Sequence, residues 1–304
     1  MVLCLVALPI FALLSIFSVR YRRLTLEAVD CLLRTVTLRK CRSGLDERIR
    51  ASISGKLLKI WPGAARFTYR YYKALSWIIF ILFTWSLVVS AAGIVNYVKY
   101  GNCNGPASTG FCLFDPTGSQ SAICEADIDI PQQTVTPAPG EGGLLIGAPD
   151  AQLTIIEFGC YTCPHTRQAQ STIEQVLEQY RGKVNLEFHP FVLSRHDFSG
   201  PAAHAAYCAD EQDKKETFHE LMLNNPEVIS QDNIDALAAK AGLDTARFDE
   251  CMVSGRYDAE VDADALLGVR AGVQGTPTFF IGDQRIVGPK PLKTFEVIID
   301  PLLR

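Results

Sequence analysis

Charge is absent from two long stretches of the sequence. Residues 2–19 and 74–95 contain no Asp, Glu, Lys or Arg and are mostly apolar. Each stretch is long enough to cross a hydrocarbon core of about 30 Å as a helix. The first also lacks the positively charged start of a cleaved signal peptide, because its charges follow the apolar run. We therefore expect two transmembrane helices, at residues 1–19 and 75–96, rather than a signal peptide or buried core helices.

Acidic residues are scarce between these stretches. Residues 20–74 hold fourteen lysines and arginines against four acids, a net charge of +10. Basic loops next to membrane spans stay in the cytoplasm, where they meet anionic lipid. This position favours lipid contact over a nucleic-acid site. We expect a two-pass protein of the cell (inner) membrane, with a basic cytoplasmic loop at 20–74 and everything after residue 96 outside the cytoplasm.

Cys4 falls in the first apolar stretch, and the other nine cysteines divide between the two sides of that membrane. Cys31 and Cys41 fall in the cytoplasmic loop and should be reduced, whereas an extracytoplasmic compartment permits disulfides. Seven cysteines are expected there: Cys103, Cys112, Cys124, Cys160, Cys163, Cys208 and Cys251. Because seven is odd, at least one of them is free, transiently bonded or paired elsewhere.

The extracytoplasmic part divides at about residue 144. Residues 97–143 are rich in Gly, Pro, Asn, Ser and Thr, which predicts a cysteine-containing loop and a Pro/Gly linker. The loop cysteines either staple the loop, for example through a Cys103–Cys112 bond, or pass electrons between a membrane partner and the Cys160/Cys163 site.

Residues 144–304 are long enough to form a domain with its own core. A buried strand at 153–158, a helix at about 164–181 and a strand at 184–193 make a βαβ unit. A helical insert at about 199–272 follows, in which Ser230 and Gly242 are typical start and stop residues of one helix. A hairpin near 282–283 and a final helix complete an α/β domain.

A reactive thiol is expected where the first strand meets the helix. Cys163 precedes Pro164, which suits the first position of a helix. The unpaired N–H groups of a helix N-terminus stabilise a thiolate, and His165 offers a further donor. Cys160 lies in the connecting loop. A zinc site would need a second pair of ligands at suitable spacing; the domain has none, so neither a metal nor a cofactor is expected.

The stretch LTIIEFGCYTCPHT, together with GTPTFFI near the end of the chain, resembles DsbA-type proteins of the thioredoxin fold. The resemblance covers residues 144–304 and implies a thioredoxin fold with a helical insertion. It implies that Cys163 is the nucleophile and that Glu157 is a buried glutamate near the site. It also implies that Thr276 and Pro277 form a cis-proline loop that contacts the substrate chain, and that Cys208 and Cys251 form a structural disulfide.

Thr166 stands where that family carries its second, resolving cysteine. Cys160 is the nearest substitute, so we expect Cys163 to attack and Cys160 to resolve; alternatively, Cys163 acts alone with an external thiol. The other histidines, at 189, 196, 204 and 219, have no clustered partners in the sequence and are interpreted as structural or solvent-facing.

The sequence therefore predicts a membrane-anchored thiol–disulfide oxidoreductase. Its substrates would be cysteine-containing proteins outside the cytoplasm, and it would have a redox partner in the membrane. The alternative is a non-catalytic binding or scaffold protein on the same fold.

Overall fold

The computed structural model describes residues 61–304 except 117, 119–121, 128–133, 226 and 228, and also the single residues 26, 30, 55 and 58. The chain divides into two compact units, residues 1–91 and 92–304. The helix expected at 1–19 and most of the loop expected at 20–74 lie outside the described residues.

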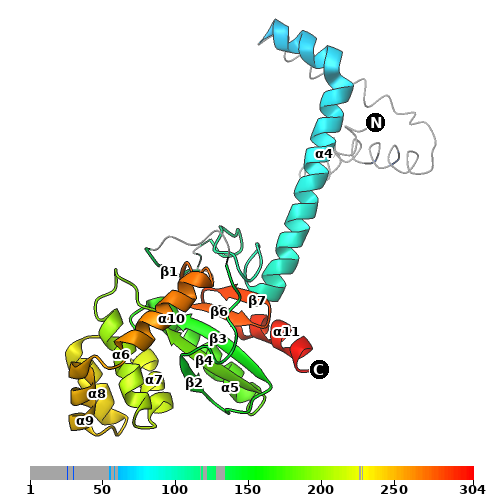
Figure 1. Cartoon of the computed structure of the whole chain (residues 1–304). Helices are drawn as coiled ribbons and strands as arrows, with labels where there is room; N and C mark the ends of the chain where they lie inside the picture. The colour runs from blue at the N-terminus through cyan, green and yellow to red at the C-terminus, as the bar shows by residue number, and fades with distance from the viewer. Residues whose placement is uncertain are drawn as a thin grey trace. The chain divides into compact units, whose positions relative to one another are not determined.

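One long helix precedes the domain. Helix α4 spans Pro62–Tyr100, with a non-helical backbone at Tyr71 (Figure 1). Within the part of the chain that is described, one segment is long and apolar enough to cross a membrane, Ile81–Tyr100. The span expected at 75–96 falls inside α4. With one candidate of this kind, the prediction of two transmembrane helices is not confirmed.

A five-stranded mixed sheet forms the centre of the domain, in the order β2-β4-β3-β6-β7 (Figure 1). Its strands are β2 (Leu144–Ile146), β3 (Leu153–Gly159), β4 (Val184–Pro190), β6 (Thr278–Ile281) and β7 (Gln284–Val287). β3 and β4 are parallel, as the βαβ pattern predicts, and the other neighbours are antiparallel. A separate two-stranded ladder joins β1 (Cys124–Glu125) to β5 (Gly275–Thr276).

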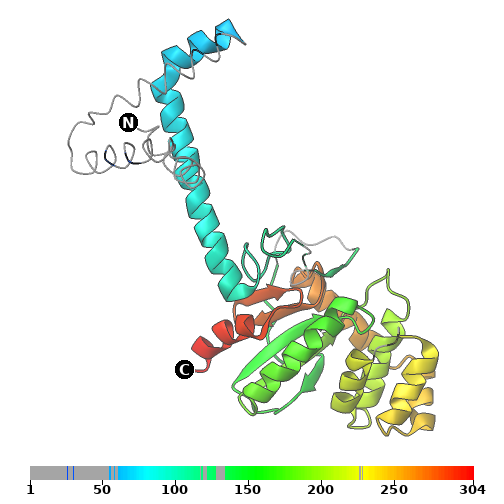
Figure 2. The same cartoon turned by 180° about the vertical axis from the view of Figure 1, so that it is seen from behind.

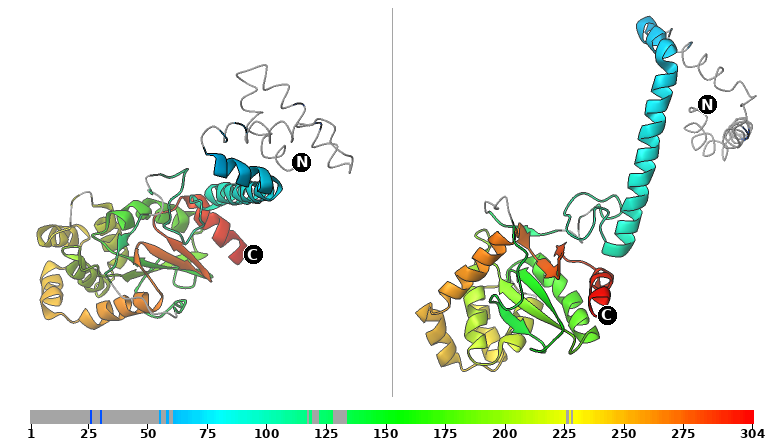
Figure 3. Two further views of the ribbon diagram at one scale, coloured as in Figure 1. Left: turned by 90° about the horizontal axis from the view of Figure 1, so that it is seen from above. Right: turned by 45° about the vertical axis from the view of Figure 1, so that its right-hand side comes forward.

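Seven helices follow α4 among the described residues. They are α5 (Pro164–Gln179), α6 (Ser199–Asp210), α7 (Lys215–Asn224), α8 (Gln231–Lys240), α9 (Thr245–Ser254), α10 (Asp258–Arg270) and α11 (Leu292–Leu302). Helices α6–α10 form the insert between β4 and β5. Helices α8 and α9 lie at the opposite end of the domain from α11 (Figures 2 and 3).

Local signals account for where some helices begin and end. Ser230 and Asn233 form a capping box at the start of α8, and Gly242 follows its end with φ +76°. Asp244 caps α9 by accepting from the N–H groups of Ala246 and Arg247. These polar caps satisfy N–H groups that the first helical turn leaves unpaired.

Two buried clusters lie on the two faces of β3. Successive strand residues point to opposite faces, so Ile155 joins a large core shared with α5 and the insert. Ile156 and Phe158 join a smaller cluster that also contains Cys160 and Cys163. Cys160 and Cys163 are therefore packed against the sheet and screened from solvent.

Candidate functional site

Cys163 occupies the N-cap position of α5, with Pro164 as the first helical residue. Its N–H donates to the carbonyl of Cys160 at 3.0 Å, and its own carbonyl accepts from Arg167 N–H at 3.2 Å. The side chain is fully buried. The strand, the turn and the helix start therefore place this sulfur where the positive end of a helix stabilises a thiolate.

Cys163 is disulfide-bonded to Cys124, 39 residues earlier in the chain, with 6.2 Å between their Cα atoms. The expected Cys160–Cys163 pair is therefore wrong for this structure. Cys124 reaches the site because β1 pairs with β5, which sets Cys124 opposite Thr276. This pairing could not be predicted from the sequence, since β1 has only two residues and pairs with a strand about 150 residues away.

Thr166 lies where the family's second cysteine would be expected, on the first turn of α5. Its hydroxyl accepts a hydrogen bond from the backbone N–H of Cys160 at 3.3 Å, and its side chain is fully buried. Thr166 thus stabilises the turn before the helix. The sulfur of Cys160 lies 3.2 Å from the hydroxyl of Ser199 and 3.0 Å from the hydroxyl of Thr162.

Cys160 is the one free cysteine among the described residues, and it is buried. Burial raises the pKa of its thiol, but hydrogen bonds from His196, Ser199 and Thr162 outweigh burial and lower that pKa below its usual value. The same contact with Cys160 raises the pKa of His196. The interpretation of His196 as a residue without partners is therefore wrong, because the chain brings it to Cys160 from a loop 36 residues away.

His165, expected to assist the nucleophile, is half-buried on the first turn of α5.

Glu157 is buried in β3, and its Oε2 atom has no hydrogen-bond partner among the described residues. Burial raises the pKa of this carboxyl to about 8. The negative charge of Glu157 also helps to raise the pKa of Tyr161, after burial itself. Tyr161 hydrogen-bonds to Nδ1 of His219 at 3.1 Å, and burial lowers the pKa of His219 to about 3. The Glu157 carboxyl therefore stays protonated near neutral pH.

The peptide bond between Thr276 and Pro277 is cis, as the resemblance implies. The sulfur of Cys163 lies 3.5 Å from the carbonyl oxygen of Thr276. The backbone of this loop thus lies next to the sulfur of Cys163, and its strand β5 pairs with β1.

A second buried histidine also has partners that the sequence did not reveal. His189 on β4 bonds to Asp264 at 2.7 Å and to Glu187 at 3.0 Å. Burial lowers the pKa of His189, but the two carboxylates outweigh it and raise that pKa to about 9. The ring stacks on Phe158 at 5.0 Å, so this ionic group supports the sheet beneath the cysteines.

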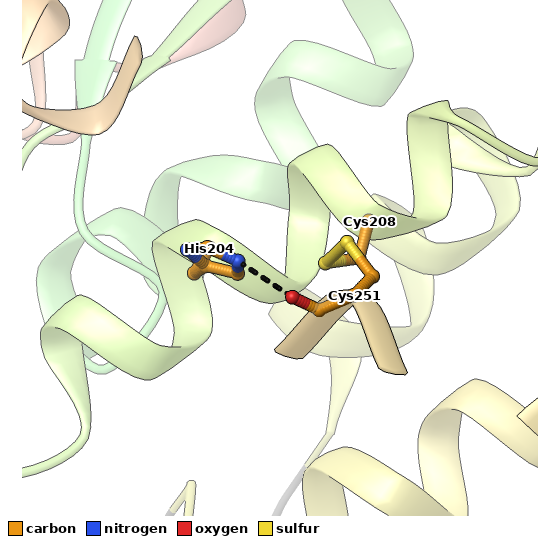
Figure 4. A group of neighbouring side chains, drawn as sticks. All are labelled: His204, Cys208 and Cys251. Carbon is orange, nitrogen blue, oxygen red and sulfur yellow. Dashed lines mark hydrogen bonds between the residues drawn. A yellow bond between two sulfur atoms is a disulfide. The ribbon is translucent and has the colours of Figure 1, made fainter. Parts of the chain in front are cut away.

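Two further disulfides do not involve Cys163. Cys208 on α6 bonds to Cys251 on α9, the pair that the resemblance implies, and His204 bonds to the Cys251 carbonyl (Figure 4). The ligand atoms of these three residues lie within 4.8 Å of one another, but the sulfurs bond each other and so offer no thiolates to a metal. Cys103 pairs with Cys112 in the loop after α4, as expected for a staple.

Comparison with known proteins places this site in a family. The sequence model of the thioredoxin family matches residues 140–301. Among curated proteins, the chain is 28% identical to Na(+)/H(+) antiporter NhaA 3 of Salinispora tropica and 24% identical to NhaA of Herminiimonas arsenicoxydans. The alignments cover 50% and 58% of this chain, but the chain spans only 24% and 28% of the length of those antiporters.

Solved structures resemble the same part of the chain. Oxidised BdbD from Bacillus subtilis matches 56% of this chain and 97% of its own, with 21% identity and a TM-score of 0.50. A thiol-disulfide exchange protein, alpha-DsbA2 from Wolbachia pipientis, matches 52% of this chain and 86% of its own, with 23% identity and a TM-score of 0.48. The family match covers more than half of the chain, and the chain therefore belongs to the thioredoxin family.

Proposed function

We propose that this thiol–disulfide oxidoreductase is anchored in the cell membrane by α4 and acts outside the cytoplasm on cysteine-containing proteins. Cys163 is its nucleophile and Cys124 is the resolving thiol. The observation that carries the proposal is the Cys124–Cys163 disulfide at the N-terminus of α5, beside the Thr276–Pro277 loop.

The exchange needs only these two sulfurs and the thiols of a client protein. A client thiolate attacks the Cys163 sulfur, and Cys124 leaves as a thiolate. A second client thiolate then attacks the client sulfur of the mixed disulfide, and Cys163 leaves as a thiolate stabilised by the helix N-terminus. The client gains one disulfide and the enzyme becomes a dithiol. A disulfide of a membrane redox partner restores the Cys124–Cys163 bond, and the reverse sequence reduces a client.

Two features favour the extracytoplasmic side. The described residues after 96 contain three disulfides, and disulfides persist in oxidising compartments. The net charge of +10 at residues 20–74 favours a cytoplasmic location for the segment before the candidate span, which would put the domain on the other side.

The activity test uses the full chain in detergent micelles and a peptide with two cysteines. The protein should oxidise this dithiol peptide when supplied with oxidised glutathione, and Cys163→Ala should reduce the rate to that of the glutathione alone. Equal activity in Cys163→Ala would contradict the catalytic assignment and favour a non-catalytic scaffold.

The location test is a fusion after Arg304. Alkaline phosphatase needs an oxidising compartment for its own disulfides, so a fusion to it should be active and a matched cytoplasmic reporter should be inactive. The opposite pattern would contradict the proposed side of the membrane.

A further inference from the structure

The segment at 122–127 contains β1, Cys124–Glu125, and we call this segment the docked strand. Cys124 is opposite Thr276, Glu125 is opposite Gly275, and the N–H of Ala126 donates to the carbonyl of Gln274 at 2.8 Å. These contacts are made by the backbone. An extended peptide that adds to a sheet edge is recognised in the same way, with little dependence on its sequence.

Gly275 allows the docked strand to approach this closely. A Cβ atom at this position would lie 2.3 Å from the carbonyl oxygen of Cys124 and 3.0 Å from the Cα atom of Glu125. Both are backbone atoms of the docked strand and cannot move aside as a flexible side chain can. The missing side chain of Gly275 therefore leaves room at the edge of β5 for the backbone of a second strand. This edge lies next to Cys163.

Side chains of the docked strand alternate in their surroundings. Cys124 and Ala126 pack against the cluster that contains Cys160 and Cys163, whereas Glu125 is exposed. A chain bound in this register therefore needs a cysteine at the first position and a small residue two positions later. The residue between them is free to vary.

The docked strand is also attached to the domain on both sides. Before it, the carbonyl of Pro106 accepts from Val287 N–H at 3.0 Å, within the loop that the Cys103–Cys112 disulfide closes. After it, Val135 N–H donates to the carbonyl of Arg270 at 3.0 Å. A strand held in this way can leave β5 and return as an intramolecular partner at high effective concentration.

We propose that the docked strand is a built-in pseudo-substrate. It fills the position of an extended client segment that carries Cys, any residue and a small residue. A client replaces it on β5 when the client sulfur replaces Cys124 on Cys163. The inference rests on the proposed function and deepens it, because it names the client class and the surface that the client and Cys124 share. The alternative is that the docked strand is only a cover over the thiol.

The test uses the full chain in detergent with Cys124→Ser, which leaves Cys163 as a thiol. The probe is a peptide with the sequence of residues 122–127, its cysteine activated as a mixed disulfide with thionitrobenzoate. Attack by the Cys163 thiolate joins the peptide to Cys163 and releases coloured thionitrobenzoate. A parallel sample with Cys124→Ser and Cys163→Ser measures the reaction of all other thiols, which is subtracted.

A second change releases the docked strand. Ala126→Pro removes the N–H that donates to Gln274, and the peptide should then react about five-fold faster, since one backbone hydrogen bond is lost from the competitor. Asp127→Pro is the matched control. The N–H of the next residue in an antiparallel strand points away from the partner, so this change should have little effect.

The shared edge is tested with a second probe, the same peptide with an N-methyl group on the alanine that corresponds to Ala126. This peptide cannot donate to Gln274, so on the Ala126→Pro variant it should react about five-fold more slowly than the unmodified peptide. Equal rates for the two peptides, with Cys163 still reactive towards oxidised glutathione, would overturn the pseudo-substrate and leave the proposed function intact. If Cys163 reacts with neither peptide nor glutathione, both proposals are wrong.

Discussion

Cys124 is bonded to Cys163 from outside the domain that the family match covers. The matched residues are 140–301, so Cys163 lies inside the domain and its disulfide partner Cys124 lies before it. This relationship explains how the site has a disulfide although Thr166 replaces the family's second cysteine. The loop before the domain therefore contributes one cysteine of this disulfide.

Gly275→Ala should weaken the Cys124–Cys163 disulfide. The new Cβ would collide with the carbonyl of Cys124 and force β1 away from β5. In a glutathione redox titration, the equilibrium should shift about five-fold or more towards the dithiol, the loss expected from one or more strand hydrogen bonds. Gly200→Ala on α6 is the matched control, because no atom lies within 4 Å of its new Cβ. An unchanged titration in Gly275→Ala would show that strand pairing does not support the disulfide.

Glu157→Gln should change how stability depends on pH. The carboxyl has a pKa of about 8 in the fold and about 4.5 when exposed, so the folded state holds a proton that the unfolded state releases between these values. The wild-type protein should therefore lose stability as pH rises from about 4.5 to 8, by on the order of 4 kcal/mol. Glutamine cannot ionise, so the variant should lack this loss. Urea unfolding at several pH values measures it, and parallel pH profiles for the two proteins would contradict the burial of an ionisable Glu157.

His196→Ala should raise the pKa of the Cys160 thiol. Burial raises this pKa, and the hydrogen bond from His196 is the largest of the contributions that lower it. The pH dependence of Cys160 alkylation, followed by mass spectrometry, should move to higher pH in the variant. His165→Ala serves as the comparison, since Cys160 has its stabilising contacts with other residues. If the two variants gave the same profile as the wild type, His196 would not act on Cys160.

The Cys208–Cys251 disulfide should support stability rather than exchange. It closes a loop of 43 residues between α6 and α9. Replacing both cysteines by alanine should lower the free energy of unfolding by about 2–4 kcal/mol in urea. The rate of dithiol oxidation below the unfolding range should stay unchanged. A loss of oxidation in the folded double variant would assign this disulfide a redox role instead.

Features set by local sequence could be predicted. Pro164 marks the start of α5, Ser230 and Gly242 mark the ends of α8, and the apolar pattern of β3 identifies a buried strand. Each depends on residues close together in the chain. The βαβ unit and the helical insert follow from such signals in sequence order.

Contacts between distant segments could not be predicted in the same way. Cys124 reaches Cys163 through a two-residue strand that has no periodic pattern, and the odd number of cysteines left several pairings open. His196 reaches Cys160 from a loop after β4 without any motif around it. Proximity in sequence favoured Cys160 as the resolving thiol, but its side chain turns towards Ser199 instead.

The most direct test of the account is disulfide mapping of the oxidised full chain by mass spectrometry. Trypsin is unsuitable because no lysine or arginine lies between Lys99 and Arg167, which leaves five cysteines in one peptide. Cleavage after Glu125 and Glu157, and then after Tyr161, separates Cys124, Cys160 and Cys163. The account predicts a Cys124–Cys163 link with Cys160 as a free thiol. A Cys160–Cys163 link, with Cys124 free, would contradict it.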